Sequence, residues 1–287
     1  MLVVTGASGQ LGRKIIENLL RLVPAERIGA SCRNPEKLAD IASLGVRVRG
    51  GDFEDAESLR HAWDGADRLL LVSSNAAATG GDTLKQHATA IEVAQRLKVG
   101  RVFYTSQVSS SSSSLFPPAR HHAATEMMLA ESGLPWTALR HGFYAASGMA
   151  MNARGIKART IVAPLDGKVA WTTHDDLAAA DAALLTSNDV VDGPTAPLTG
   201  SEALDLADIA QMAGQILGTS IPRTVMSDED MRKNAEASGV PQAGIGVMMG
   251  YYYAARAGEF RQVDSTLANM LGREPETMSA FMTKTLG

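Results

Sequence analysis

The stretch Leu2-Val-Val-Thr5-Gly6-Ala-Ser-Gly9-Gln-Leu-Gly12 decides the fold. Its opening residues, Leu2–Thr5, are an apolar run typical of a buried strand. The apolar residues that follow recur at helical spacing, in one stripe formed by Leu11, Ile15, Ile16, Leu19, Leu20 and Val23. The glycines between the two patterns have the spacing G-x-x-G-x-x-G. The sequence therefore predicts a strand, a glycine-rich turn and a helix.

The first half of the chain repeats this alternation. Short apolar runs predict further strands at 27–32, 46–49, 67–73, 101–105 and 136–139, and helical patterns separate them at 35–44, 55–63, 82–97 and 123–132. Strands that alternate with helices of this length form βαβ units around a parallel sheet. Right-handed crossovers with helices on both faces would make it a doubly wound α/β sheet.

The alternation of strand and helix patterns ends at about residue 146. The segment 150–161 is less regular, and helical patterns then cover 175–185, 203–216, 227–238, 245–257 and 263–271, with Ser201 as the expected cap of the second of these. We therefore expect a doubly wound domain over residues 1–148 and a smaller, helix-rich substrate-binding lobe over 149–287. The boundary is expected to be discontinuous, with part of 169–200 returning to the first domain.

Composition excludes several classes of protein. The 287 residues are 45% hydrophobic and carry a net charge of −4, so no basic excess drives nucleic-acid binding. A single cysteine, Cys32, excludes an internal disulfide and a cysteine-rich zinc site. No apolar run approaches the ~20 residues that span a bilayer. Because the sequence enters a predicted strand at once, we expect no signal peptide. We expect a cytoplasmic protein, a monomer or homodimer, without a nucleic-acid, membrane or metal partner.

The glycine-rich turn predicts a phosphate site. Gly6 permits a tight turn, Gly9 lets the backbone approach a pyrophosphate, and Gly12 lets the helix pack closely on the strand. The free N–H groups and positive dipole end of the helix favour phosphate. The alternative is a glycine-rich turn without a ligand. The candidate contacts are Gly6, Ser8, Gly9, Gln10, Leu11 and Gly12.

The end of the second strand distinguishes between the two dinucleotides. NAD sites place an acidic residue there to accept from the ribose 2′-OH, but this chain has Ser31-Cys-Arg33-Asn34. Arg33 can bind a 2′-phosphate through a charge-assisted pair, with Arg13 and Lys37 as helpers. The sequence thus favours NADP(H) as the cofactor. The alternative for Arg33 is a solvated surface cation.

Other predicted strands also end in ligand-competent residues, at the edge where an α/β sheet binds its ligand. Asp52 could accept from an adenine amino group, with Phe53 near the ring, although Asp52 could instead cap the helix near Asp55. The remaining candidates suit the pyrophosphate or ribose (Ser73, Ser74 and Asn75) and the nicotinamide (Tyr104, Thr105 and Ser106). Their alternatives are an ordinary turn and a strand end without ligand contact.

Two further segments supply candidate catalytic groups. Arg140-His-Gly142-Phe143-Tyr144 follows the sixth strand, where Gly142 and Phe143 could wall the nicotinamide and Tyr144 could donate to a substrate. The alternative is packing between the two lobes. His122 stands at the expected start of the helix 123–132, and an imidazole that titrates near pH 7 can donate or relay a proton. The alternative is a solvated helix terminus.

Several of these motifs together resemble the NmrA-like branch of the atypical short-chain dehydrogenases/reductases. They are GASGQLG at 6–12, CRNPEK at 32–37, VRGGDF at 48–53, HHAATE at 121–126, GLPWTALRHGFY at 133–144 and LGREP at 271–275. The chain looks closest to the branch's NADPH-dependent quinone oxidoreductases and triphenylmethane reductases. The resemblance implies a Rossmann sheet, bound NADP(H) and a small aromatic or quinone-like substrate.

One motif of ordinary short-chain dehydrogenases is missing. None of the eight lysines has a tyrosine four positions before it, so the chain lacks Tyr-x-x-x-Lys. This fits hydride transfer to a quinone or another flat conjugated acceptor, which needs little acid catalysis, and it disfavours a sugar-nucleotide epimerase. The remaining alternative is a non-catalytic NAD(P)-binding redox sensor of the NmrA type.

Two segments are open to functional and structural interpretations. The serine run 109–114 connects the fifth strand to the His122 helix and is either a mobile flap over the site or a tolerated loop. The segment 245–253 is rich in Met and Tyr and is either a wall for a flat substrate or a helical core stripe.

Overall fold

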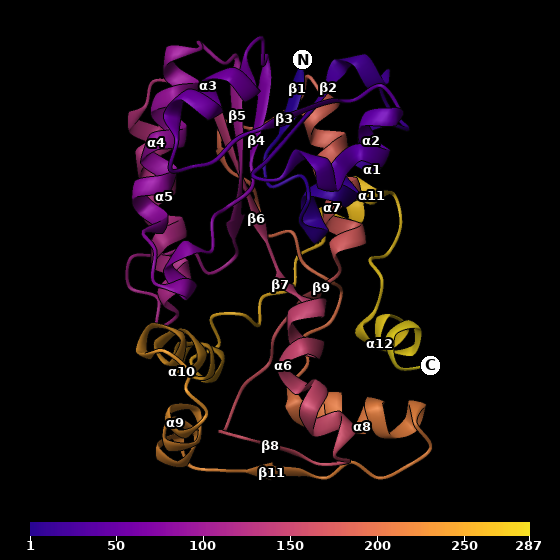
Figure 1. The fold of residues 1–287 in the computed structure, drawn as a ribbon. Coiled ribbons are helices and arrows are strands. Elements are labelled where there is room, and N and C mark those ends of the chain that lie inside the picture. The colour runs from indigo at the N-terminus through magenta and orange to yellow at the C-terminus, as the bar shows by residue number, and fades with distance from the viewer.

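A seven-stranded sheet forms the upper part of the molecule (Figure 1) in a computed structural model that describes residues 1–287. Its strand order is β10-β6-β5-β4-β1-β2-β3, and all its pairings are parallel. The strands are β1 Leu2–Val4, β2 Ile28–Cys32, β3 Arg47–Gly50, β4 Arg68–Leu71, β5 Arg101–Gln107, β6 Trp136–His141 and β10 Gly193–Pro194. The order reverses between β1 and β4, which is where such sheets bind ligands.

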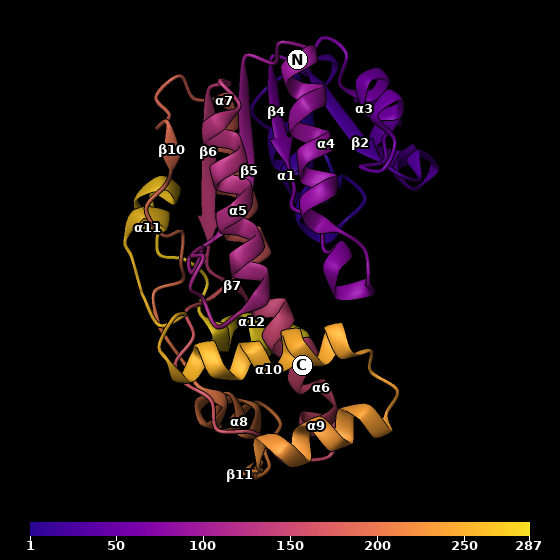
Figure 2. The ribbon, with the colours of Figure 1, turned by 90° about the vertical axis from the view of Figure 1, so that its left-hand side faces the viewer.

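Helices cover both faces of this sheet (Figures 1 and 2). One face carries α3 (Ala56–Trp63), α4 (Thr83–Arg96) and α5 (Pro117–Glu131), and the other carries α1 (Gln10–Leu19), α7 (His174–Thr186) and α11 (Thr266–Leu271). Short turns η1 (Ala25–Arg27) and η2 (Pro35–Leu38) with α2 (Ala39–Ser43) flank β2, and η3 (Ala76–Thr79) follows β4. The predicted doubly wound α/β fold is confirmed.

The apolar stripe of the first helix explains its place in the fold. Ile15, Ile16 and Leu19 of α1 are fully buried in a core shared with β1, β2 and α7. Each such side chain contributes roughly 1.5–3 kcal/mol on burial. The polar residues of α1 face outward, as in Lys14, which pairs with Asp175 at the start of α7. Packing of α7 on α1 thus attaches a late segment of the chain to the sheet.

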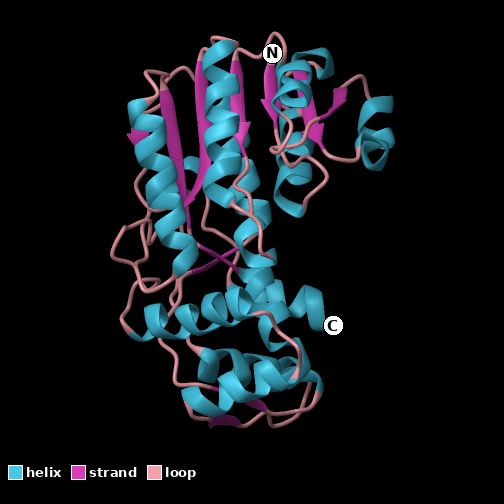
Figure 3. Cartoon of the chain, turned by 60° about the vertical axis from the view of Figure 1, so that its left-hand side comes forward, coloured by secondary structure: helices cyan, strands magenta, loops and turns pink.

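The lower part of the molecule is mostly helical (Figure 3). It contains α6 (Ala145–Lys157), α8 (Leu206–Ile216), α9 (Asp228–Ala237), α10 (Gln242–Arg256) and α12 (Met278–Leu286). Two short parallel pairs join these helices, β8 (Ile161–Ala163) with β11 (Arg223–Val225) and β7 (Phe143–Tyr144) with β9 (Trp171–Thr172). A core separate from that of the sheet fills this part. The division of the chain at residue 148 stays a prediction.

The structure corrects the sequence predictions at three helices. Helix α5 begins at Pro117, because proline lacks the N–H that the first helical turn leaves unpaired, so His122 lies inside the helix and not at its start. The segment expected to be less regular, 150–161, lies largely in α6. Helix α8 is capped by Asp205, with a reciprocal bond from Asp208, and not by Ser201.

No helix in the structure is both long enough and apolar enough to cross a lipid bilayer.

Candidate active site

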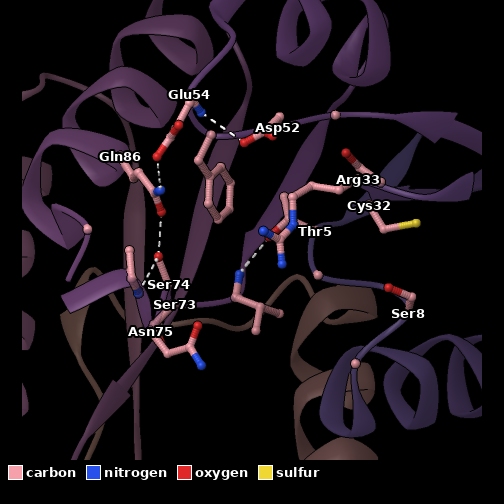
Figure 4. Close-up of a pocket in the computed structure, with 18 of the residues that line it drawn as sticks. Thr5, Ser8, Cys32, Arg33, Asp52, Glu54, Ser73, Ser74, Asn75 and Gln86 are labelled. Atoms are coloured by element: carbon pink, nitrogen blue, oxygen red, sulfur yellow. Dashed lines mark hydrogen bonds between the residues drawn. The ribbon is translucent and has the colours of Figure 1, made fainter. Parts of the chain in front are cut away.

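A cavity of about 1000 Å³ opens at the carboxyl ends of β1 to β4, on the switch point of the sheet (Figure 4). Four segments line it, and each follows one of these strands. They contribute Thr5, Gly6, Ser8 and Gly9; Ser31, Cys32, Arg33, Asn34 and Lys37; Gly51, Asp52, Phe53 and Glu54; and Val72, Ser73, Ser74, Asn75, Ala76, Thr79, Gly80, Gly81 and Gln86. The structure therefore brings most of the predicted dinucleotide residues together.

The glycine-rich turn has the geometry of a phosphate cradle. Gly6 has a φ of +57°, which favours glycine. A Cβ on Gly12 would lie 2.5 Å from the carbonyl oxygen of Gly6, so only glycine lets α1 pack this closely on the turn. Gly9 is the N-cap of α1, and no side chain caps that helix. Its first N–H groups therefore remain available to an anionic ligand.

The part of the cavity wall that follows β2 carries two cations. Arg33 and Lys37 both line it, and both are exposed and make no ion pair. Arg13, the third predicted cation, instead binds Glu17 and Asp40 and does not line the cavity. Its role as a helper is not supported. The alternative role of Asp52 as a helix cap is wrong, because α3 is capped by Asp55, whose carboxylate accepts from the backbone N–H groups of 57 and 58. Asp52 instead lines the cavity.

Side chains from neighbouring elements hold the backbone that follows β4. The N–H of Val72 donates to Thr5 Oγ1 of the β1 segment, at 2.9 Å. The next N–H, of Ser73, donates to Thr105 Oγ1 of β5, also at 2.9 Å. The N–H after that, of Ser74, donates to Nε2 of His87 of α4. These bonds replace the sheet ladder where the chain leaves it, and they fix the wall of the cavity.

His87 of α4 holds the third N–H. Nε2 of His87 accepts from the backbone N–H of Ser74 at 2.9 Å, so Nδ1 carries the ring proton. Nδ1 donates to Thr125 Oγ1, which in turn donates to the carbonyl of His121. Burial lowers the pKa of His87 to about 4, which keeps the ring neutral. His87 is fully buried, and its role is to shape the cavity.

The opposite wall is a chain of polar contacts visible in Figure 4. Ser74 Oγ donates to Gln86 Oε1, and Gln86 Nε2 donates to Glu54 Oε1 at 3.0 Å. The N–H of Glu54 donates to Asp52 Oδ1 at 3.1 Å. Asp52 is thereby oriented, and its second oxygen remains available to a ligand. Gln86 and Glu54 lacked any local motif, and only the tertiary fold brings them here.

A second cavity, of about 170 Å³, adjoins the first at Ser73, which lines both. Its walls come from the ends of β5 and β6, from α5 and from the start of α6. They are Ser73, Ser106, Gln107, His122, His141, Gly142, Phe143, Tyr144 and Ser147. The predicted catalytic pair, His122 and Tyr144, therefore faces one space at the end of the dinucleotide cavity. Its aromatic wall is Phe143, which also packs on Phe260 at 5.0 Å between ring centroids.

His122 is a neutral group in this cavity. Its Nδ1 lies 2.8 Å from the Oη atom of Tyr104, which is fully buried and also interacts with Thr125. Thr125 Oγ1 already accepts from Nδ1 of His87 and donates to the carbonyl of His121, so we assign the phenol proton to the contact with His122. The phenol therefore donates to Nδ1, and Nε2–H remains the free donor of the ring. Burial lowers the pKa of His122 to about 3. His122 can thus donate a hydrogen bond at neutral pH but carries no positive charge.

Tyr144 is backed by two buried ionisable groups. Its Oη lies 3.4 Å from Nδ1 of His141, and Nε2 of His141 lies 2.9 Å from Oδ1 of Asp181. Burial and the carboxylate of Asp181 raise the pKa of Tyr144 above its usual range. Tyr144 therefore keeps its proton near neutrality. The ring of His174 packs on Tyr144 from the other side, at 4.4 Å between centroids.

Some predicted contacts line neither cavity. The side chain of Leu11 belongs to the core, and those of Tyr104 and Thr105 support His122 and Ser73 from behind. Ser106 does line the small cavity, and its hydroxyl donates to Glu126, which also binds Arg140 through two bonds. The remaining residues of this group, Gln10 and Gly12, lie in the first turn of α1 and line neither cavity.

The two ambiguous segments lie outside both cavities. The serine run is fixed at its end, where Ser114 Oγ and the N–H of Leu115 both donate to Glu259, the latter at 2.9 Å. In α10, Ile245, Met249 and Tyr251 are buried in the lower cores, which supports the core interpretation of the segment 245–253. The structure contains no group of three His, Cys, Asp or Glu side chains that could hold a metal ion.

Comparison with known proteins identifies the family. The NAD(P)H-binding family model matches residues 6–188. The chain belongs to this family. It is 32% identical to quinone oxidoreductase 2 of Escherichia coli over 280 residues, and this alignment covers 97% of this chain and 96% of that protein. It is 30% identical to an NmrA-like oxidoreductase of Aspergillus flavus, over 95% of this chain and 91% of that protein.

Solved structures agree with this assignment. The structure of E. coli quinone oxidoreductase 2 with NADPH superposes with a TM-score of 0.90 at 31% identity, over 100% of this chain and 99% of that one. The Citrobacter sp. triphenylmethane reductase complexed with NADP(H) has a TM-score of 0.87 at 28% identity, with 99% of each chain covered. The predicted NmrA-like resemblance is confirmed, and the chain is an NAD(P)H-dependent oxidoreductase.

Proposed function

We propose that the protein reduces a quinone or another flat conjugated acceptor with NADPH. One observation carries this proposal: the large and the small cavity adjoin, since Ser73 lines both. The larger has the shape and chemistry of a dinucleotide site, and the smaller lies where the reactive end of that dinucleotide would reach. The related proteins are named as a quinone oxidoreductase and a triphenylmethane reductase, and both names describe reduction of a conjugated acceptor, which supports the proposal.

The chain's own residues fit the dinucleotide. The uncapped N-terminus of α1 would receive the pyrophosphate, and the hydroxyl of Ser8 lies beside it. Asp52 and Phe53 would hold the adenine, and the unpaired cations Arg33 and Lys37 would receive a 2′-phosphate. Because the end of β2 has no acidic residue for a ribose 2′-OH, this arrangement favours NADPH over NADH.

The small cavity supplies orientation and neutral hydrogen-bond donors. When bound, the dihydronicotinamide supplies hydride. Gly142 and Phe143 would wall its ring, and the Nε2–H of His122 and the hydroxyl of Tyr144 would hold the acceptor oxygen. No strong acid faces this space, since His122 is neutral and the chain lacks Tyr-x-x-x-Lys. Quinones suit such a site because their reduced anion is spread over the ring.

An NADPH-consumption assay, followed by absorbance, tests the proposal. The acceptors are a panel of quinones, azo and triphenylmethane dyes and enones. We expect saturable turnover with quinones, slower turnover with enones and little with NADH in place of NADPH. Tight binding of NADPH without turnover of any acceptor would contradict the proposal and favour a redox sensor instead.

A further inference from the structure

A buried histidine–carboxylate pair lies directly behind Tyr144. Asp181 comes from the middle of α7 and His141 from the end of β6, and their exposed fractions are 0% and 1%. Nε2 of His141 contacts one carboxylate oxygen of Asp181, and the other oxygen has no hydrogen-bond partner. Nδ1 of His141 faces the hydroxyl of Tyr144. Asp181 belongs to no motif that the proposed function uses, and His141 lies in the segment 140–144 and lines the small cavity but has no role in that function so far.

Apart from His141, no neighbouring group supplies a positive charge that could neutralise the carboxylate of Asp181. His122 of α5 and His174 of α7 face the pair, and burial lowers their pKa values to about 3 and about 4, so both are neutral. Lys14 of α1 is engaged by Asp175 at the exposed start of α7. A lone buried carboxylate is costly, so the pair is stable when Asp181 and His141 together hold one extra proton and are neutral overall.

The extra proton decides the hydrogen bond to Tyr144. In the neutral pair, one proton lies between Nε2 and the carboxylate and the second lies on Nδ1, whichever partner is formally charged. The Nδ1–H of His141 then donates to Tyr144, whose own proton is free to point into the cavity. With one proton fewer, Nδ1 would be bare and Tyr144 would donate to it, away from the cavity.

We propose that Asp181 and His141 form a proton relay that orients and reprotonates Tyr144. The proposal rests on the proposed function. After the acceptor has gained hydride, its oxyanion takes the hydroxyl proton of Tyr144, and the O–H bond of Tyr144 breaks. The phenolate takes the Nδ1 proton of His141. The pair is left with its single remaining proton and regains the other from solvent. Asp181 and His141 are positioning residues, because they act through Tyr144.

Nitrogen NMR of the unliganded protein tests the relay without turnover. The chain has six histidines, so ¹⁵N-histidine labelling gives a spectrum in which loss of a signal set in His141→Asn assigns that residue. We expect a protonated Nδ1 in the parent protein at neutral pH. In Asp181→Asn, an isosteric and neutral replacement, the amide oxygen accepts from Nε2–H and no extra proton is needed, so Nδ1 becomes bare. A bare Nδ1 in the parent would overturn the relay, whatever the enzyme reduces.

Steady-state kinetics with an enone and a quinone provide a second test of the relay. Asp181→Asn should lower kcat for an enone about 10²-fold, and for a quinone far less, with the KM values unchanged. The control is Asp176→Asn, which removes another buried carboxylate of α7 that binds Arg273 and the N–H of Glu276 but not His141. This control should leave Nδ1 protonated and the enone-to-quinone ratio unchanged. Equal losses in the two variants, or unchanged kcat for the enone in Asp181→Asn, would also overturn the relay.

Discussion

Tyr104 of β5 and His122 of α5 form a hydrogen bond, in which Oη of Tyr104 lies 2.8 Å from Nδ1 of His122. Tyr104 was expected to contact the cofactor, but its ring is fully buried behind the cavity. The contact fixes which nitrogen of His122 carries the proton, and so it sets the direction of the one donor that the ring offers to a ligand. Tyr104 therefore affects the site through His122.

Tyr104→Phe should weaken acceptor binding without unfolding the protein. The ring remains in place, but Nδ1 of His122 loses its donor, and the imidazole can exchange tautomers and rotate. We expect kcat/KM for quinones to fall roughly threefold to tenfold, mainly through KM, because a net hydrogen bond contributes about 1 kcal/mol. Steady-state kinetics measure this loss.

The matched control for this variant is Tyr253→Phe, which removes a hydroxyl bonded to Arg232 in the lower part of the molecule. It should leave both kinetic constants unchanged. The rates of the parent should also show no titration of His122 between pH 5.5 and 8, since its pKa is about 3. An essential group that titrates near pH 6.5 and disappears in His122→Gln would contradict the neutral role of this ring.

His87 predicts how stability changes with pH. The unfolded chain binds the His87 proton near pH 6.5 and the folded protein only near pH 4. Between these values the unfolded state holds more protons, so this term stabilises the fold fully above pH 6.5 and is lost as the pH falls toward 4. The full effect is about 3 kcal/mol, at 1.36 kcal/mol for each pKa unit.

His87→Gln should remove that part of the pH dependence. A glutamine can accept from the N–H of Ser74 and donate to Thr125, and it does not titrate. Urea unfolding at a series of pH values should show a shallower decline between pH 6.5 and 4 in this variant than in the parent. Parallel declines in the two proteins would mean that His87 is not the group responsible. A residual decline from His122 and His174 is expected in both.

The sequence was sufficient to predict the sheet and the large cavity because both depend on local patterns. A buried parallel strand is an apolar run, a packed helix is a stripe with a 3.6-residue period, and the carboxyl ends of parallel strands share one edge. Gly6, Arg33, Asp52 and Ser73 each follow a strand directly, so their meeting follows from the topology alone.

The supporting residues could not be predicted in the same way. His87 and Asp181 lie in the middle of helices and reach the site only through the packing of α4 and α7 on the sheet. Their one sequence signal is a polar residue on an otherwise apolar helix face, which fixes burial but not the partner. The start of α5 was missed because Pro117-Pro118 reads equally well as a loop and as a first helical turn.

Arg33→Ala should reduce the preference for NADPH. Arg33 lines the cavity without an ion-pair partner, so nothing else in the chain competes for its guanidinium. Losing one charge-assisted contact costs about 1.5–3 kcal/mol, or roughly tenfold to a hundredfold in affinity for NADPH. Affinity for NADH should change little, because NADH has no 2′-phosphate. Calorimetric titration of both dinucleotides measures the two constants.

Arg13→Ala is the matched control for that experiment. Arg13 follows Gly12 in the same region, but it binds Asp40 and Glu17 and lies outside the cavity. Its removal should leave the ratio of NADPH to NADH affinity unchanged. An equal ratio in Arg33→Ala and the parent would show that Arg33 does not read the 2′-phosphate.

Two glycine variants should separate binding from folding. Gly9 has φ −81° and ψ 168°, a conformation open to any residue, and a Cβ there would lie 3.1 Å from the carbonyl oxygen of Gly6. A Cβ on Gly12 would lie 2.5 Å from the same oxygen and 2.9 Å from its carbon, and both are backbone atoms that cannot move aside cheaply. Gly12→Ala must therefore push α1 away from the turn.

We expect Gly9→Ala to remain folded and to bind NADPH at least tenfold more weakly, because its methyl group narrows the space that a pyrophosphate needs at the helix N-terminus. Gly12→Ala should lose roughly 1–3 kcal/mol of stability, as overpacked sites do, and should lose binding as a consequence. Thermal unfolding and calorimetric titration of both variants make the comparison. Full NADPH affinity in a folded Gly9→Ala variant would remove the glycine-rich turn from the dinucleotide site, because Gly9 is the only α-helix N-cap among the residues that line the cavity.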